Sequence, residues 1–345
     1  MRFGTRKDRP YRKEGTIKFW TKANKIMNEE ETRNRLIRPA IAGAGWSDAQ
    51  IREEFPYTLG RIHVAGKKWK RGDTKKVDFL LEYRPGVPLA LVEAKHIGKP
   101  LGDGMQQALG YAEALDVPFV FSSNGEGFLF HDKTGASAAT EQNLTLEQFP
   151  SPEELRTRFV GWKEKRGVPL TVLTTEFQNE DPLKSERYYQ RIAVDRAVES
   201  FSAGQRRLLL VMATGTGKTR VASQIIWRLK KLGLVKRVLF LADRNVLVDQ
   251  AKANDFSHFG SSITKITRQS FAHTGDLMAH EMFVGIYQAL TGPSESDKLF
   301  KKLPPDFFDL IVIDECHRSA FGDWNAILKH FSGAVHLGMT ATPKR

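Results

Sequence analysis

Residues 206–219 read "RRLLLVMATGTGKT", an apolar run that leads into a glycine-rich loop and a lysine. The apolar run is typical of a buried parallel strand, and the periodicity of residues 218–233 predicts a helix directly after the loop. Backbone N–H groups of such a loop can close around phosphate oxygens, and the helix N-terminus adds a favourable dipole. The stretch therefore predicts a nucleotide-binding α/β domain.

Similar apolar runs recur through the C-terminal half of the chain and alternate with helical patterns. They are rich in Val, Ile and Leu and cover residues 237–243, 282–288, 309–315 and 334–342. Strands that alternate with helices in this way are typical of a doubly wound parallel sheet. We therefore predict an α/β fold of this kind for residues 185–345.

The glycine-rich loop supplies most of the predicted ATP site. Its glycines let the backbone approach the phosphates, its lysine can reach the β- and γ-phosphates, and the threonine after it can hold Mg²⁺. The loop residues expected to bind ATP are Thr214, Gly215, Thr216, Gly217, Lys218 and Thr219. About 95 residues later, "LIVIDECH" (310–317) ends a predicted strand in two acids. We expect Asp314 to hold the same Mg²⁺ and Glu315 to activate water, because ligands bind at the carboxyl edge of such sheets.

The N-terminal half carries a second pattern, in "VDFLLEYRPGVPLALVEAKH" (77–96). Side chains alternate along a strand, so Glu93 and Lys95 face the same side. Asp78 lies on the preceding predicted strand, and the hairpin-like turn "YRPGVP" brings it to the same edge. Carboxylates suit Mg²⁺, and a lysine can orient an attacking water. Two interpretations stay open here: a surface ion pair, or a metal-dependent nuclease.

The residues around this pattern predict an α/β arrangement between residues 27 and 150. Helices are expected at residues 29–46 and 105–115. Strands are expected at residues 58–65, 77–83, 89–95, 118–124 and 127–132. Gln107 and Tyr111 have i, i+4 spacing on the second helix and therefore share one face.

Positive charge gathers near the N-terminus. Residues 1–76 hold 20 Lys/Arg against 9 Asp/Glu, which is +11 of the total net charge of +13. Such an excess suggests a nucleic-acid partner, and a solvated basic tail is the alternative. The stretch 66–76 favours DNA, because its basic residues lead directly into Asp78 and could position a DNA backbone there. The expected DNA contacts in it are Lys67, Lys68, Lys70 and Arg71.

Length and composition restrict the class of protein. With 345 residues, the chain is long enough for two domains. No apolar run approaches the length that spans a bilayer, and the start has no apolar core of a secretory signal. Cys316 is the only cysteine, so an intramolecular disulfide is impossible. We therefore expect a cytoplasmic protein without a membrane partner.

Several C-terminal motifs resemble those in the first, RecA-like domain of superfamily 2 helicases and translocases. They are "YYQ" (188–190), "LADRNVLVDQ" (241–250), "YQAL" (287–290), "DECH" (314–317) and "GMTATP" (338–343). The resemblance implies that Tyr189 and Gln190 read the adenine and that Arg244 lies on the DNA track. It also implies that the residues coupling hydrolysis to movement are His317, Thr340 and Thr342.

The N-terminal pattern resembles the PD-(D/E)xK nuclease domain with its trailing Q-x-x-x-Y motif. The resemblance assigns catalytic roles to Asp78, Glu93, Lys95, Gln107 and Tyr111. An acid on the first helix usually completes such a site. The stretch "NEEETR" (28–33) offers three glutamates, of which we favour Glu29 as the third Mg²⁺ ligand beside the two strand carboxylates. A helix N-terminal charge without a catalytic role is the alternative for Glu29.

The order of the two domains resembles the R subunit of a type I restriction enzyme, from about residue 27 to residue 345. The most specific pieces are "EETR…LI.P…GW" (30–46), "VEAKH" (92–96) and "DECHRS" (314–319). The resemblance implies ATP-driven translocation of double-stranded DNA followed by Mg²⁺-dependent cleavage. It also implies methyltransferase and specificity subunits as partners, with S-adenosylmethionine used only through them.

The resulting division is a basic leader (1–26), a nuclease domain (27–150), a connector (151–184) and a first motor domain (185–345). We expect Met27 to be the natural start, since "MNEEETR" resembles the opening of family members. Two other functions stay open: a stand-alone nuclease–helicase of DNA repair or phage defence, and a non-catalytic DNA-binding remnant.

The resemblance predicts low ATPase activity for the isolated 345-residue chain. ATP sites of this type close between two motor domains, and the arginine finger, which adds several orders of magnitude to the rate, normally comes from the second. The sequence stops directly after "TATPKR". We therefore expect weak ATP binding and little turnover in a steady-state phosphate-release assay. A rate comparable to that of intact motors would contradict this expectation.

Overall fold

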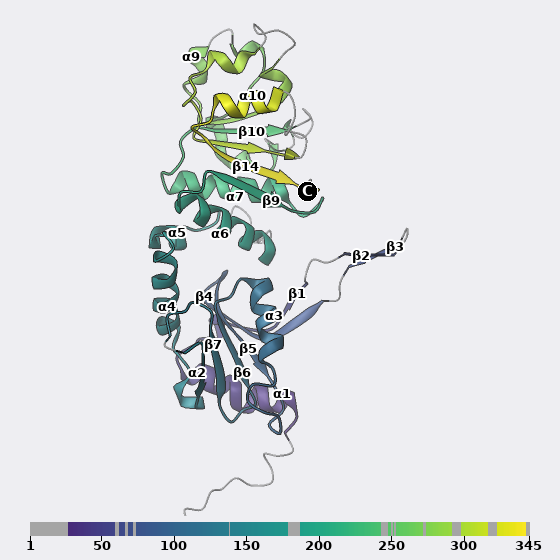
Figure 1. Ribbon diagram of the computed structural model, residues 1–345, viewed down its shortest axis with the longest axis vertical. Coiled ribbons are helices and arrows are strands. Elements are labelled where there is room, and N and C mark those ends of the chain that lie inside the picture. The colour runs from purple at the N-terminus through teal and green to yellow at the C-terminus, as the bar shows by residue number, and fades with distance from the viewer. Residues whose placement is uncertain are drawn as a thin grey trace, which may run out of the picture.

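The computed structural model shows two α/β bodies stacked along the long axis of the molecule (Figure 1). It describes residues 27–58, 62–65, 68–71, 74–137, 139–178, 187–242, 248–249, 251, 253–271, 274–291, 298–316 and 323–342. We call residues 27–164 the N-terminal body and residues 168–342 the C-terminal body. None of the described helices is long and apolar enough to cross a membrane.

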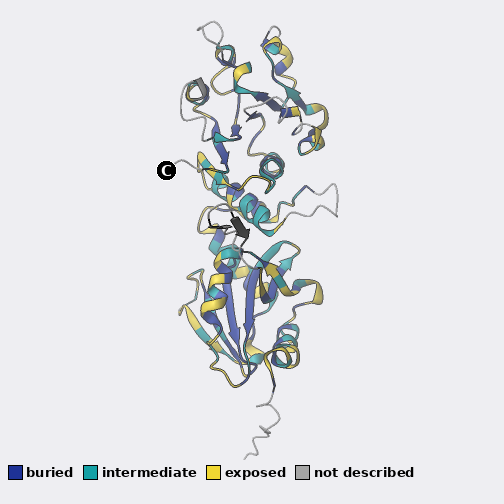
Figure 2. Cartoon of the chain, turned by 90° about the vertical axis from the view of Figure 1, so that its right-hand side faces the viewer, coloured by how far each residue is buried: buried dark blue, intermediate teal, exposed yellow. Residues whose placement is uncertain are grey.

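The N-terminal body is built on a mixed sheet with the strand order β1-β4-β5-β6-β7-β8. Its neighbouring strands are antiparallel except β5 and β6, which are parallel. The bounds are β1 Ile51–Tyr57, β4 Lys75–Arg84, β5 Val87–Ala94, β6 Phe119–Ser123, β7 Phe128–Asp132 and β8 Glu141–Leu144. The central strands are buried on both faces (Figure 2), which explains why they read as nearly continuous apolar runs.

Helices cover both faces of this sheet. One face packs against a nearly continuous helix made of α1 (Glu29–Thr32), a π-helical turn (Arg33–Ile37) and α2 (Arg38–Gly43). The other face packs against α3 (Met105–Leu115). Both helices were expected from the sequence. The π-helical turn was not, and such turns occur frequently at functional sites.

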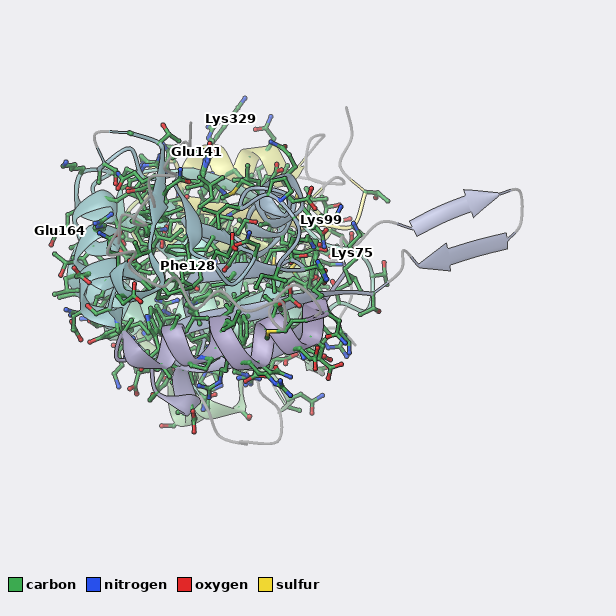
Figure 3. All side chains as sticks on the ribbon, turned by 90° about the horizontal axis from the view of Figure 1, so that it is seen from below. Lys75, Lys99, Phe128, Glu141, Glu164 and Lys329 are labelled. Atoms are coloured by element: carbon green, nitrogen blue, oxygen red, sulfur yellow. The ribbon has the colours of Figure 1, made fainter. Side chains whose placement is uncertain are left out.

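The expected strand at residues 58–65 is confirmed for residues 62–65 and not for residue 58, and the strand before it, β1, was not expected. The structure has β1 ending at Tyr57 and a separate strand β2 (Ile62–Ala65), which pairs with β3 (Lys68–Arg71). The sequence of β1, "IREEFPY", is polar and contains a proline, so it does not have the pattern of a buried strand. It can be a strand because it lies at the sheet edge, where its middle residues are exposed. The ribbon of β2 and β3 stands clear of the body (Figures 1 and 3).

The C-terminal body is the doubly wound parallel sheet that the sequence predicted. Its strand order is β11-β12-β10-β13-β14-β9, and every pair is parallel. The bounds are β9 Arg207–Val211, β10 Val238–Ala242, β11 Ile263–Lys265, β12 Met282–Ile286, β13 Leu310–Ile313 and β14 Val335–Thr340. Alternate residues of β10 enter separate cores on the two faces, so helices must cover both sides.

Helices α6 (Tyr188–Ser202) and α7 (Lys218–Lys231) cover one face of this sheet, and α10 (Asp323–His330) covers the other. The short helices are α9 Thr274–Leu277 and the 3₁₀ turns Asp48–Gln50, Leu146–Gln148, Ser257–Ser262, Gln269–Phe271, Tyr287–Ala289 and Leu299–Lys302. Helix α6 lies on the side of the C-terminal body that faces the N-terminal body (Figure 1). Its position lets one helix contact both of them.

The predicted connector, residues 151–184, contains two helices. Helix α4 (Pro152–Glu164) places Leu155 in the N-terminal core, whereas α5 (Leu170–Thr174) places Val172 in the C-terminal core. The ammonium of Lys163 at the end of α4 donates to both carboxylate oxygens of Glu199 on α6, at 2.8 and 2.7 Å. This ion pair is mostly buried and ties the two bodies together.

Replacing Lys163 should destabilise the protein, because Glu199 would lose its counter-charge in a site where burial already raises its pKa. We expect Lys163→Met to lower the free energy of unfolding by about 3 kcal/mol, as measured by urea denaturation. The exposed neighbour Lys165 is the matched control, and Lys165→Met should change stability by less than about 0.5 kcal/mol. Equal effects of the two substitutions would show that the pair does not hold the bodies together.

Candidate functional site

Asp78 and Glu93 meet on neighbouring strands in the centre of the N-terminal sheet. They lie one step beyond the paired residues Phe79 and Val92 of β4 and β5. The Asp78 Oδ2 atom accepts the backbone N–H of Ala94 at 2.8 Å. Strand pairing therefore holds the two carboxylates at one place, as the sequence predicted.

Lys95 contacts Glu93 in a buried setting. Its Nζ donates to Glu93 Oε1 at 2.8 Å, and Glu93 is only 3% exposed. A pair at this depth is not a surface ion pair, because removing both charges from water is costly. The structure therefore excludes the surface ion pair as the interpretation of "VEAKH" (92–96).

Burial dominates the electrostatics of this cluster. It raises the pKa of Glu93 to about 7; the hydrogen bond from Lys95 opposes the rise, and the charge of Asp78 adds to it. Burial also raises the pKa of Asp78, against the Ala94 N–H and the charge of Arg33. For Lys95, burial lowers the pKa, but the hydrogen bond that it donates to Glu93 and the charges of the surrounding carboxylates together outweigh this effect, and the net pKa is raised. Burial thus disfavours the ionised forms of both carboxyl groups, and a bound cation would stabilise them.

The cluster fits a divalent cation. The Glu93 Oε2 atom is buried and has no hydrogen-bond partner among the described residues. An unpartnered carboxylate oxygen beside a second carboxylate is the kind of ligand that Mg²⁺ takes. Glu29, at the start of α1, is near enough for its charge to raise the pKa of Glu93. Within the described ranges, however, no three Asp, Glu, His or Cys side chains form a group that could hold a metal, so Glu29 stays a predicted ligand.

Helix α3 brings Gln107 and Tyr111 to the same cluster. The Gln107 side chain donates to the Tyr111 hydroxyl, and its Oε1 accepts a long contact of 3.5 Å from Lys95 Nζ. Tyr111 lies on the face of α3 that packs on the sheet, and Gln107, one turn earlier, lies at the exposed margin of that face. Gln107 therefore contacts Lys95 directly, and Tyr111 holds the Gln107 side chain.

Two residues of the site were not predicted from the sequence. Arg33, in the π-helical turn, lies 3.6 Å from Asp78 Oδ1 and 3.1 Å from Glu54 Oε1. Gly104 caps α3, and a Cβ added there would lie 2.9 Å from Glu93 Cγ and 3.1 Å from Lys95 Cε. A larger residue at Gly104 would push both side chains away. The glycine directly before a predicted helix was the available signal.

The glycine-rich loop of the C-terminal body has the expected geometry. Gly215 and Gly217 have φ angles of +77° and +85°, a region that favours glycine. Helix α7 begins at Lys218, whose Nζ lies 3.4 Å from Glu315 Oε1. Thr219 occupies the first turn of the same helix. The loop thus lies at a helix N-terminus, with its lysine beside the acid that follows β13.

The start of α6 contacts this loop. Gln190 Nε2 donates to the carbonyl of Thr216 at 2.9 Å, and the Tyr189 hydroxyl donates to the same carbonyl at 3.4 Å. A groove of about 860 Å³ runs between α6, β9 and the loop, and its lining includes Thr214 and Gly215. Tyr189 and the first half of the phosphate loop, Thr214 to Thr216, therefore border one groove, whose lining does not include Gln190 or Lys218.

Three further predicted motor residues, Asp314, Thr340 and Thr342, follow or end strands at the carboxyl edge of the sheet. The Asp314 Oδ1 atom accepts the backbone N–H of Glu315 at 3.0 Å. The carbonyl of Thr340, at the end of β14, accepts the N–H of Met212 at 3.0 Å, and its hydroxyl oxygen accepts the N–H of Thr342 at 3.1 Å. These bonds connect the end of β14 with the strand that leads into the phosphate loop.

Some predicted residues lie outside this description. Lys67, Arg244 and His317 are not among the described residues, and for Lys68, Lys70 and Arg71 the structure describes only the backbone of β3. The assignments to DNA contact and coupling for these positions stay predictions.

Comparison with known proteins agrees with this geometry. Residues 183–345 match the family described as "Type III restriction enzyme, res subunit". The endonuclease subunit of the type I restriction enzyme EcoAI from Escherichia coli is 48% identical over 323 residues, which cover 92% of this chain and 39% of that protein. The corresponding EcoKI subunit of E. coli K12 is 29% identical over 270 residues, which cover 67% of this chain and 22% of that one.

A solved structure gives the same result at the level of the fold. The fragment structure of an HsdR subunit of a type I restriction enzyme from Vibrio vulnificus YJ016 superposes with a TM-score of 0.69 at 37% identity, covering 92% of this chain and 56% of that chain. The chain spans about two fifths of the EcoAI relative. By sequence and by fold, it is therefore a relative of the endonuclease (R) subunits of type I restriction enzymes, with a helicase-like domain in its C-terminal half.

Proposed function

We propose that this chain is the part of a type I restriction R subunit that cuts unmodified double-stranded DNA with Mg²⁺ and carries the ATP site of the motor. The observation that carries the proposal is the buried cluster of Asp78, Glu93 and Lys95 with its unpartnered Glu93 oxygen. A polypeptide that served only as a motor or as a DNA tether would have no use for such a costly arrangement.

In the nuclease step, the residues of this chain bind, orient and stabilise. When Mg²⁺ is bound, it neutralises phosphate charge and lowers the pKa of an attacking water. Asp78 and Glu93 would hold it, and the Ala94 N–H keeps the Asp78 carboxylate in place. Lys95, supported by Gln107 at 3.5 Å, would orient the water or stabilise charge on the phosphate. Tyr111 in turn fixes Gln107.

In the motor step, Lys218 would exchange partners. In this structure its ammonium faces Glu315, and the phosphates of ATP offer a stronger set of acceptors at the same loop. Glu315 would then be released to activate water, and Thr219 and Asp314 would hold Mg²⁺. Tyr189 and Gln190 would read the adenine at the start of α6.

The partners follow from the same proposal. The relatives are named as subunits of type I restriction enzymes, which supports double-stranded DNA together with methyltransferase and specificity subunits as partners. The ribbon of β2 and β3 continues from the end of the strand pair β1–β4 that carries Asp78. We propose that the basic residues in its sequence, Lys68, Lys70 and Arg71, contact DNA next to the cleavage site.

Lys95→Ala tests the nuclease directly. We expect the wild-type chain to nick supercoiled plasmid DNA in the presence of Mg²⁺ and the variant to be slower by at least about 100-fold, because a charge that acts on the transition state is removed. The exposed Lys99, which pairs only with Asp103 at 3.8 Å, is the matched control, and Lys99→Ala should cut normally. Equal rates for wild type and Lys95→Ala would exclude the cluster as the nuclease site.

The proposed ATP site is tested separately, by replacing Lys218. Lys218→Ala should weaken binding of a fluorescent ATP analogue by at least about tenfold, since it removes a charge-assisted hydrogen bond to phosphate. Lys231, at the opposite end of the same helix, is the control, and Lys231→Ala should bind as the wild type does. Unchanged affinity of the Lys218 variant would place the nucleotide elsewhere.

A further inference from the structure

The start of α6 contacts the phosphate loop through two hydrogen bonds and one close side-chain contact. The Thr216 carbonyl accepts from both Gln190 and Tyr189, at 2.9 and 3.4 Å. A Cβ added at Gly217 would lie 2.4 Å from Gln190 Nε2, so the glutamine side chain rests on the loop itself. If the loop changes conformation on binding phosphate, the side chains of the first turn of α6 that contact it must therefore move as well.

Tyr188, the neighbouring residue, contacts the other body. Its hydroxyl donates to the carbonyl of Thr58 and accepts the N–H of the same residue at 3.2 Å. Its ring lies edge-on to Phe55 of β1, with centroids 6.4 Å apart. The hydroxyl thus makes two hydrogen bonds to the backbone of a single residue, Thr58, which fixes the start of α6 against the end of β1.

From β1 the contacts continue to the nuclease cluster. Tyr57 is buried, and its ring lies edge-on to Tyr111 with centroids 5.1 Å apart. Tyr111 accepts from Gln107, and Gln107 accepts from Lys95, which pairs with Glu93. The row from Thr216 to Glu93 consists of packed rings and hydrogen bonds, interrupted only by covalent neighbours.

We propose that Tyr188 is a positioning residue that communicates nucleotide binding at the phosphate loop to the nuclease cluster. The inference rests on the proposed function, since it needs both a nucleotide and a nuclease site. Coupling between sites requires an element that both of them contact. Tyr188 meets this condition because it stands next to the residues that contact the loop and bonds the strand end that packs on Tyr111.

The structure also offers a contact between the bodies that is not part of this row. Arg84, at the end of β4, donates to the carbonyl of Leu173 on α5 at 3.1 Å. Its removal weakens the docking of the two bodies without touching α6 or α3. Arg84→Met is therefore the control that separates coupling from docking.

The experiment is hydrogen–deuterium exchange of the full chain with and without a saturating, non-hydrolysable ATP analogue and Mg²⁺. In the wild type we expect amides of α3 to exchange at least about threefold more slowly when nucleotide is bound, because nucleotide that stabilises the phosphate loop also stabilises the first turn of α6 and, through Tyr188, the strand end that packs on α3. Tyr188→Phe keeps the ring and removes both hydrogen bonds. It should bind the analogue within about twofold of the wild type but lose the effect on α3.

The outcomes are distinguishable. Nucleotide binding without any change in α3, full retention of the change in Tyr188→Phe, or an equal loss in Arg84→Met would each overturn the inference and leave the proposed function standing. Absence of analogue binding in a titration would overturn the ATP half of the proposed function together with the inference. A cleavage assay gives the second readout, in which nucleotide should change the nicking rate of the wild type by about fivefold or more and not that of Tyr188→Phe.

Discussion

The N-terminal body depends on how it accommodates two carboxylates in the centre of a sheet. Burying Asp78 and Glu93 without compensation would be unfavourable. The chain compensates with the Ala94 N–H, the ammonium of Lys95 and the guanidinium of Arg33. The compensation is incomplete, since one Glu93 oxygen has no partner among the described residues. An oxygen atom of this kind is available to a metal ion, which is the basis of the proposed Mg²⁺ site.

In the C-terminal body the proposed ligand site is formed by backbone groups and not by charged strand side chains. A left-handed glycine turn and the N-terminus of α7 provide backbone N–H groups that favour an anion. The two proposed sites would therefore attract opposite charges, Mg²⁺ in one body and phosphate in the other. Helix α6 lies between them, with Gln190 on the phosphate loop and Tyr188 on the strand end beside the nuclease face. This sharing of one helix is the physical basis on which two chemistries can operate in one chain.

Sequence reasoning succeeded where chemistry follows from short spacing. The i, i+2 spacing of Glu93 and Lys95 and the i, i+4 spacing of Gln107 and Tyr111 placed these side chains correctly. It failed for β1, where an exposed edge strand has too few apolar residues to be detected. It also missed Arg33, because the distance from α1 to β4 is set by packing and not by any periodicity.

The sequence by itself determined the motifs, the α/β class and the parallel sheet, because these depend on residues close together in the chain and on the alternation of strands and helices. Only the tertiary structure decided that Glu93 is buried and that Gly104 leaves room for its side chain. It also decided that Tyr188 joins Thr58, 130 residues away. Burial and contact between distant segments depend on how whole elements pack, and the loss of water from a charged group is a property of that packing.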